Sequence, residues 1–158
     1  IPSTLEVAGM SAGDRIEGLP GGISVVAYPS TDSGVSFMIE TSGGKKIFHA
    51  GDLNLWHWKD DSDSTEVKKS ELAFKKALNS ISGENPTIYI AMFPVDPRMG
   101  TDFGEGAREF LTDIKVDNFF PMHFWGMKDE AKTFLSTIPG DSSDIHFIYT
   151  PGASVDIK

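Results

Sequence analysis

Short runs of β-branched and aromatic residues make the first half of the chain strand-rich. Such runs occupy residues 23–28, 35–40 and 46–49, and each predicts a β-strand. A tight Gly-rich turn at 41–44 separates the last two runs, so we expect those two strands to pair as a hairpin.

The second half alternates between helical and strand patterns. Asp63 and Glu66 have the spacing of a capping box and are followed by apolar residues at helical intervals, which predicts a helix to about residue 79. The continuous apolar run 87–93 predicts a strand buried on both faces. The same patterns predict helices over 102–114 and 128–138 and strands over 118–120, 145–149 and 154–157.

This order of elements predicts an α/β protein of layered architecture, with a mixed sheet covered by helices on one face. The predicted strands carry apolar residues on both sides, so the second face of the sheet also needs a cover. Missing partner structure is one candidate for that cover. A homo-oligomer, in which a second copy covers the exposed sheet face, is the other.

The composition limits the classes of protein that fit. A length of 158 residues with 39% hydrophobic residues suits a single domain over 1–158. The net charge of −9, with no basic patch, argues against a nucleic-acid partner. The absence of cysteine excludes disulfides, thiolate metal sites and a cysteine nucleophile. No apolar run is long enough for a membrane helix, and we expect a cytoplasmic protein.

Polar side chains occur where predicted strands end. Asp52 follows His49 and a glycine at the end of one strand, and His123 follows another. Such positions face the crevice where ligands bind in α/β proteins. Carboxylates and imidazoles suit Zn²⁺, Mn²⁺ or Fe, and a carboxylate can bridge two metals. Gly-Asp is also a common turn pair and a histidine after a strand is often a packing residue, so both interpretations stand.

Two further segments could contribute to a pocket. His57 lies between Trp56 and Trp58, and a metal ligand, a pocket residue and a surface residue are all compatible with that position. Asp96 and Arg98 lie in a proline-containing loop that leaves the buried strand. They form an ion pair that shapes a pocket, or Arg98 binds an anionic group of the substrate.

Four segments taken in order, 30–40, 46–52, 89–94 and 119–123, resemble the metallo-β-lactamase-fold metal-dependent hydrolases. The resemblance covers residues 10–150 and corresponds to the later part of that family's domain. It implies an αββα sandwich with a dinuclear metal site at one edge of two facing sheets. The family's early His-x-His-x-Asp-His motif does not occur in this sequence. We therefore expect an N-terminally truncated version, the C-terminal two-thirds of such a domain.

The resemblance also implies roles for individual residues. Asp52 matches the bridging aspartate and His123 matches the late histidine, so both are expected to be catalytic as metal ligands. Asp32 lies where an intermediate histidine usually stands and is either a third metal ligand or, with Ser30, part of the pocket lining. His49 is expected to orient Asp52 through a hydrogen bond. The other pocket candidates are Asn54, Trp56, His57, Trp58, Asp96 and Arg98.

The implied cofactor is a divalent metal, with two zinc ions, or else manganese or iron, in the intact protein. The implied function is hydrolysis of an ester, thioester, lactone or phosphoester by a metal-bound hydroxide. Because few of the family's ligands are present, we expect the 158-residue form to be inactive and metal-free or weakly metallated. The alternative is a degenerate, non-catalytic relative that binds a small molecule or a protein, or that oligomerises.

Overall fold

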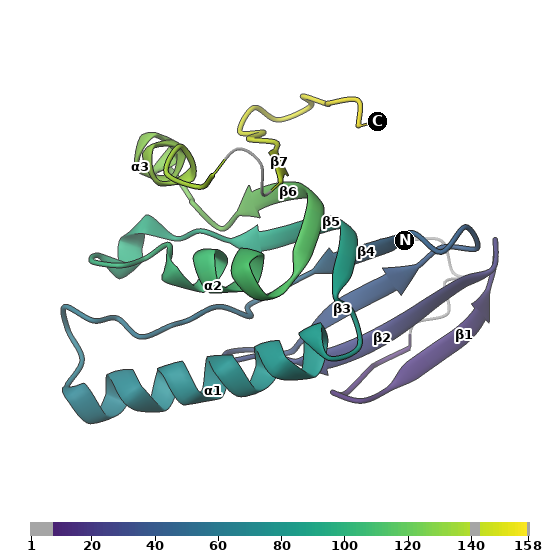
Figure 1. Cartoon of the computed structure of the whole chain (residues 1–158), viewed down its shortest axis with the longest axis horizontal. Coiled ribbons are helices and arrows are strands. Elements are labelled where there is room, and N and C mark those ends of the chain that lie inside the picture. Colours follow the sequence, from purple (N-terminus) through teal and green to yellow (C-terminus); the bar gives the residue numbers. More distant parts are fainter. Residues whose placement is uncertain (1–7, 140–142, 158) are drawn as a thin grey trace.

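A seven-stranded sheet, in which the strands lie side by side in chain order, organises the protein (Figure 1). The computed structural model describes residues 8–139 and 143–157. Strands β1 to β4 pair antiparallel, and β4 to β7 pair parallel. The strands are β1 (Arg15–Leu19), β2 (Ile23–Pro29), β3 (Val35–Glu40), β4 (Lys46–His49), β5 (Thr87–Pro94), β6 (Lys115–Met122) and β7 (Asp144–Ile145).

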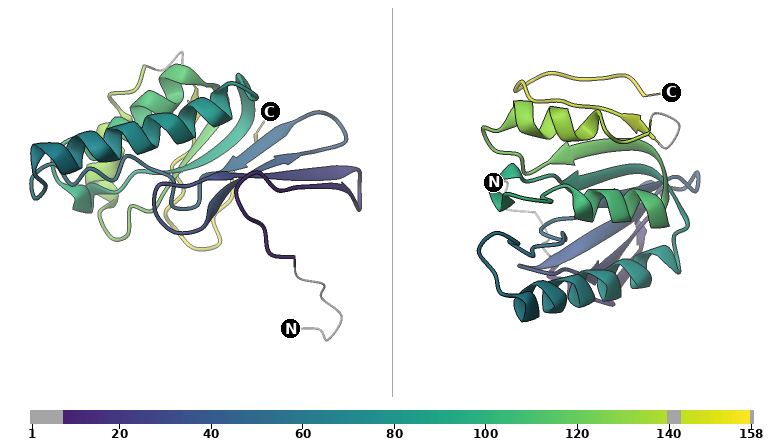
Figure 2. Two further views of the ribbon diagram at one scale, coloured as in Figure 1. Left: turned by 90° about the horizontal axis from the view of Figure 1, so that it is seen from below. Right: turned by 60° about the vertical axis from the view of Figure 1, so that its left-hand side comes forward.

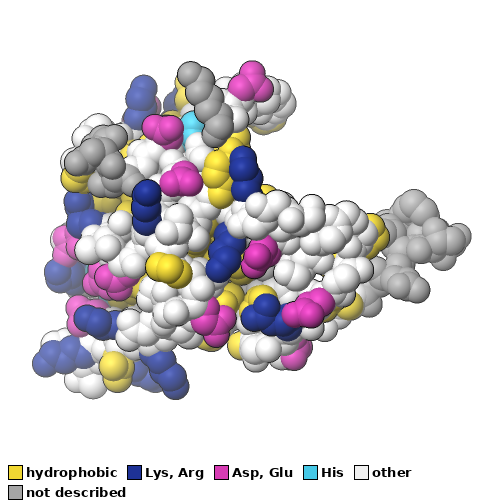
Figure 3. All heavy atoms as spheres, turned by 45° about the vertical axis from the view of Figure 1, so that its right-hand side comes forward, with side chains coloured by type: hydrophobic (Ala, Val, Ile, Leu, Met, Phe, Trp, Pro, Cys, Tyr) yellow, Lys and Arg dark blue, Asp and Glu magenta, His cyan; other side chains and the backbone are white. Residues whose placement is uncertain are grey.

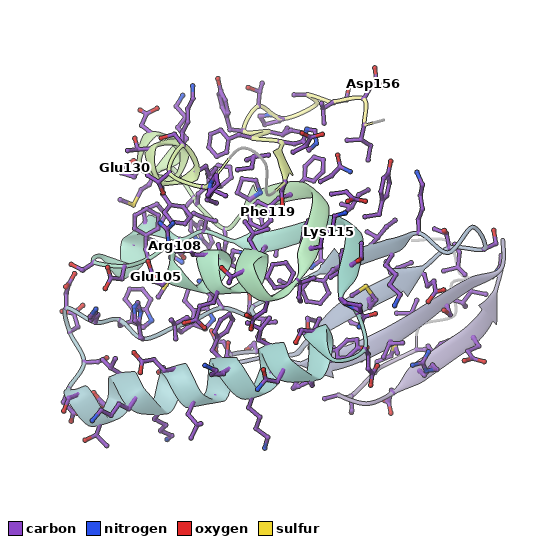
Figure 4. All side chains as sticks on the ribbon, viewed as in Figure 1. Glu105, Arg108, Lys115, Phe119, Glu130 and Asp156 are labelled. Carbon is purple, nitrogen blue, oxygen red and sulfur yellow. The ribbon has the colours of Figure 1, made fainter. Side chains whose placement is uncertain are left out.

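Each parallel crossover carries helical structure. The helices are α1 (Ser64–Ser82), η1 (Pro97–Met99), α2 (Glu105–Asp113) and α3 (Lys128–Leu135). Asp63 caps α1 by accepting from the Thr65 and Glu66 backbone N–H groups, and the Glu66 side chain completes the expected capping box. On α2, Glu105 and Arg108 form an i,i+3 ion pair at 3.3 Å (Figure 4).

The core lies between the helices and one face of the sheet, as the two further views show for α1 and α2 (Figure 2). Phe93 of β5 lies at its centre, with its ring stacked on Phe110 of α2 at a centroid distance of 4.6 Å. Phe74 of α1 and Phe119 of β6 each lie 6.4 Å from Phe93. All four rings are fully buried, so this aromatic cluster joins two helices to the two central parallel strands.

The opposite face of the sheet is also apolar, and none of the described helices packs on it. Because side chains alternate across a strand, the residues next to the buried Met38, Phe48 and Phe119 point to this other face. The apolar residues on that face have partly exposed side chains. This open sheet face consists of Val25, Phe37, Ile39, Ile47, Ile90, Met92 and Phe120.

The predicted α/β class, the hairpin of β3 and β4 and the helical layer are confirmed. Strand β1 was not predicted, because its polar sequence lacks a β-branched run and it forms by pairing with β2 at the sheet edge. The predicted strand over 154–157 is wrong. The strand predicted over 145–149 is present only as its first residue, because β7 ends at Ile145. After His146 donates its backbone N–H to the Phe119 carbonyl, the chain leaves the sheet. Helix α3 ends at Leu135, three residues before the predicted end.

The described helices include no candidate membrane span, because no helix within 8–139 or 143–157 is long and apolar enough to cross a membrane. On the face drawn in Figure 3, acidic and basic side chains are interspersed.

Candidate functional site

The turn after β4 brings Asp52 to the edge of the sheet. Gly51 adopts a left-handed backbone conformation with φ of 57°, and a Cβ atom there would lie 2.8 Å from the Val35 carbonyl oxygen. Only glycine fits this turn without a shift of the backbone. The Trp56 indole N–H donates to the Asp52 carbonyl at 2.7 Å and so stabilises the turn.

Three polar residues follow three adjacent parallel strands at the same edge. Asp52 follows β4, Asp96 follows β5 and His123 follows β6. Because parallel strands end at one edge of a sheet, the connecting loops meet there. Asp52 Oδ1 lies 3.5 Å from His123 Nε2, and Asp96 Oδ2 lies 3.0 Å from His123 Nδ1. The two residues that the resemblance matched to metal ligands are therefore neighbours.

Asp96 is a fully buried carboxylate that holds two other side chains. It accepts hydrogen bonds from Nε and Nη2 of Arg98, the latter at 2.5 Å, and it faces His123. Burial raises the pKa of the Asp96 carboxyl, but the hydrogen bonds from Arg98 and His123 outweigh burial, and the net pKa is below its ordinary value. Asp96 is thus an ionised acceptor.

An ionised Asp96 fixes which nitrogen of His123 carries the proton. A carboxylate can only accept, so Nδ1 of His123 donates to Asp96, and in the neutral imidazole the lone pair of Nε2 points toward Asp52. The Trp125 indole nitrogen also approaches Nδ1, at 3.3 Å. The shorter, charge-assisted contact to Asp96 decides the tautomer. His123 therefore presents an acceptor to the cavity.

A cavity of about 300 Å³ lies over these residues. Its lining consists of Thr31, Asp32, Asp52, Trp56, Trp58, Arg98 and His123. Six of these seven were candidates from the sequence, and Asp96 lies directly behind Arg98 and His123. Thr31 was missed because its role is structural: its hydroxyl donates to the Asn54 carbonyl and joins two loops of the cavity wall.

Besides Asp96, four sequence candidates do not line this cavity. Asn54 is buried, and its amide nitrogen contacts the Met99 sulfur. His57 is only 3% exposed, so its side chain lies in the interior of the protein. His49 accepts the Gly51 backbone N–H at 3.0 Å, so it supports the turn rather than contacting the Asp52 carboxylate. The Ser30 hydroxyl accepts the Asp32 N–H at 3.4 Å.

Strained backbone is concentrated around the cavity. Among the described residues, four non-glycine residues have positive φ, and they include Trp58 at 42°, His123 at 66° and Trp125 at 48°. Such conformations cost on the order of 1–3 kcal/mol each and are often found at binding and catalytic sites. The strain places His123 and two large aromatic side chains at the cavity.

The donors in the cavity fit part of a metal site. Asp52 and His123 supply one carboxylate oxygen and one imidazole nitrogen that face each other, which is a suitable pair for a divalent metal. Within the described part of the chain, no three His, Cys, Asp or Glu side chains come close enough to hold a metal ion. These residues therefore provide two donors but not a complete coordination shell.

Comparison with known proteins gives a likeness of fold. No protein-family model and no curated protein matches the sequence. A solved structure from Parabacteroides distasonis, named "Putative metal-dependent hydrolase", aligns with a TM-score of 0.52 and 15% identity over 87% of this chain and 56% of that chain. A structure from Thermotoga maritima, named "putative zn-dependent hydrolase of the metallo-beta-lactamase superfamily", aligns with a TM-score of 0.43 and 18% identity over 72% of this chain and 47% of that chain.

The first of these alignments shows a shared fold, which agrees with the expected layered α/β architecture. The chain spans about half the length of the solved structures it matches. Large parts of those proteins thus have no counterpart in this chain. At these levels of identity the likeness concerns the fold, and the chemistry of the site has to be argued from its own residues.

The buried His57 predicts a pH dependence of folding. Burial is the largest cause that lowers the pKa of His57, and the nearby Asp102 only partly opposes it. Its Nδ1 has no hydrogen-bond partner among the described residues. Below about pH 6.5 the unfolded chain binds a proton at this histidine before the folded protein does, so the stability falls with falling pH, by at most ~1.4 kcal/mol per pH unit for this group.

Urea unfolding between pH 7.5 and 5.5 measures this effect. We expect His57→Gln to reduce the loss of stability on acidification, whereas Leu72→Ala, at an exposed apolar residue of α1, leaves it unchanged. An equal pH dependence in wild type and His57→Gln would contradict the prediction.

Proposed function

We propose that the protein, in its complete form, is a metal-dependent hydrolase whose centre includes Asp52 and His123. The 3.5 Å approach of Asp52 Oδ1 to His123 Nε2 carries this proposal. In the neutral imidazole both atoms are acceptors, because Asp96 holds the proton on Nδ1. Two acceptors that face each other in a cavity repel, and a cation between them turns the repulsion into attraction.

The residues of the chain have separable roles in this proposal. Asp52 and His123 hold the metal, and Asp96 orients His123, as carboxylates commonly do for metal-binding histidines. A divalent metal in such a site supplies an activated water and polarises the bond to be broken. Arg98 lines the cavity and uses Nε and Nη2 for Asp96, so its Nη1 is available for a negatively charged oxygen of the substrate. The substrate is an ester, thioester, lactone or phosphoester.

We also propose that the chain forms the later part of a larger domain. Two donors are too few for a stable metal centre, and the open sheet face leaves seven apolar side chains partly exposed. A preceding segment that covers this face and supplies further ligands accounts for both features. On this proposal the 158-residue chain alone is inactive and binds metal weakly.

The test compares the longest form of the protein that its gene encodes with the 158-residue chain. Zinc content and hydrolysis of bis-p-nitrophenyl phosphate and of a simple lactone are measured for each. We expect metal-dependent hydrolysis in the longer form and none in the chain alone. Two fully occupied metals per 158-residue chain, or a longest form that hydrolyses neither probe with zinc, would overturn the proposal.

A non-catalytic binding protein is the second candidate. The absence of a cluster of three metal-binding side chains from the described residues favours it. The open sheet face would then bind a partner protein or a second copy of the chain. Light scattering distinguishes the two candidates: a stable dimer of the longest form, without metal and without hydrolysis, supports the binding protein.

Asp96 provides a prediction about positioning. Asp96→Asn removes the charge that holds the Nδ1 proton of His123, and we expect the zinc affinity of the longer form to fall by about 10–100-fold. Competition with a chromogenic chelator measures the affinity. Asp61→Asn, at an exposed carboxylate outside the cavity, is the control and should change nothing. A lower melting temperature with unchanged zinc affinity would show that Asp96 has only a structural role.

A further inference from the structure

Two of the three tryptophans line the candidate cavity, and the third contacts residues of its lining. The sequence contains three tryptophans, and Trp56 and Trp58 line the cavity of Asp52 and His123. Trp125 comes from a distant loop and contacts two lining residues, Arg98 and His123. The largest aromatic side chains therefore converge on the candidate site from two separate segments.

Two of these tryptophans are exposed although the backbone is strained to place them. Trp58 is 37% exposed and Trp125 is 65% exposed, and both have left-handed backbone conformations. A bulky residue seldom adopts this conformation, and most of the surface of Trp125 remains exposed. Exposed, fixed aromatic rings beside a cavity are typical of ligand recognition.

Trp125 is held as a rigid platform. The Arg98 guanidinium lies over one face of the indole ring, 4.7 Å from its centroid, and Arg98 is itself fixed by the buried Asp96. His123 meets the indole edge-on, with 5.6 Å between centroids and an interplanar angle of 87°. These contacts restrain the ring at one face and at an edge while most of its surface remains exposed.

The cation already on one face of Trp125 favours a neutral ring over a second cation on the other face. Tryptophan binds both aromatic rings and cations on its face. The Arg98 cation already occupies one face of Trp125, so a second cation on the opposite face would be repelled. A metal at Asp52 and His123, which rests on the proposed function, adds further positive charge.

We propose that the cavity recognises a substrate with a neutral aromatic ring, and that this ring stacks on Trp125 and Trp58 beside the bond to be hydrolysed. The indole N–H of Trp56 donates a hydrogen bond to the Asp52 carbonyl, so Trp56 is a fixed part of the cavity wall. Trp58 and Trp125 are accordingly residues that determine specificity. They take no part in the bond-breaking step.

Nuclear magnetic resonance tests this proposal without turnover and without metal. The three indole N–H signals of the ¹⁵N-labelled protein are assigned with single Trp→Phe variants. The protein is then titrated with benzamide, with cyclohexanecarboxamide and with choline. The first two probes have the same amide and similar size, but only benzamide has a flat aromatic ring, and choline is a cation.

We expect benzamide to shift the Trp58 and Trp125 signals and to bind about three- to tenfold more tightly than cyclohexanecarboxamide. Trp125→Leu should remove this preference. Tyr149→Leu, at an exposed aromatic residue that does not line the cavity, should keep it. Equal binding of the two amides, tighter binding of choline, or a preference that survives both Trp58→Leu and Trp125→Leu would overturn the proposal.

The result is independent of the outcome for hydrolysis. If the longest form binds no metal and hydrolyses nothing but benzamide still shows its preference, the proposed function fails and ring recognition stands. If the protein hydrolyses phenyl and cyclohexyl esters equally well and shows no preference between the amides, ring recognition fails and the hydrolase stands.

Discussion

Replacing Asp52 with Asn or His123 with Ala is expected to lower kcat/KM of the longest encoded form by at least about 10³-fold. Loss of a residue that only supports a metal ligand typically costs about 10–100-fold, and loss of the ligand itself should cost more. Each variant removes one of the two donors that face each other across 3.5 Å. Steady-state hydrolysis of bis-p-nitrophenyl phosphate with saturating zinc measures the effect.

Two variants outside the cavity serve as matched controls. Asp117→Asn removes an exposed carboxylate on β6. His146→Ala removes a histidine whose Nε2 contacts Asn118. Both should keep nearly full activity. If Asp52→Asn and His123→Ala are as active as the controls, the proposed centre is wrong.

Replacing Phe93 with Ala is expected to destabilise the chain by about 3–5 kcal/mol. Phe93 is fully buried and contacts Phe74, Phe110 and Phe119, so its removal leaves a cavity between both helices and the sheet. This loss is a large part of the ~5–15 kcal/mol that typically stabilises a domain. Urea unfolding at pH 7.5, followed by circular dichroism, measures the free energy of unfolding.

Leu72→Ala is the control for this prediction. Leu72 lies on α1 with 72% of its surface exposed, so its truncation should change the free energy of unfolding by less than about 0.5 kcal/mol. A similar loss of stability in both variants would show that the aromatic cluster around Phe93 does not hold the layers together.

Much of the fold follows from local signals in the sequence. The capping box at Asp63 and the apolar run of β5 predicted α1 and a central strand. Strand β1 carries no such signal, because it depends on pairing with β2. The strands predicted after Ile145 were too extensive. Hydrophobic alternation shows only that a segment is compatible with a strand, and a strand also has to pair with a neighbouring strand.

The candidate site was only partly predictable. Asp52 and His123 lie at strand ends, and parallel strands bring such ends together, so their proximity could be anticipated. The inward rotation of His57 and the role of Trp125 depend on loop conformations with positive φ at Trp58, His123 and Trp125. Such conformations are uncommon for non-glycine residues and have no reliable local sequence signal.

Anomalous diffraction at the zinc edge, from crystals of the longest encoded form grown with zinc, tests whether Asp52 and His123 share a metal ion. We expect an anomalous peak about 2.0–2.2 Å from both an Asp52 carboxylate oxygen and His123 Nε2. Zinc bound elsewhere, with neither residue in contact, would contradict it.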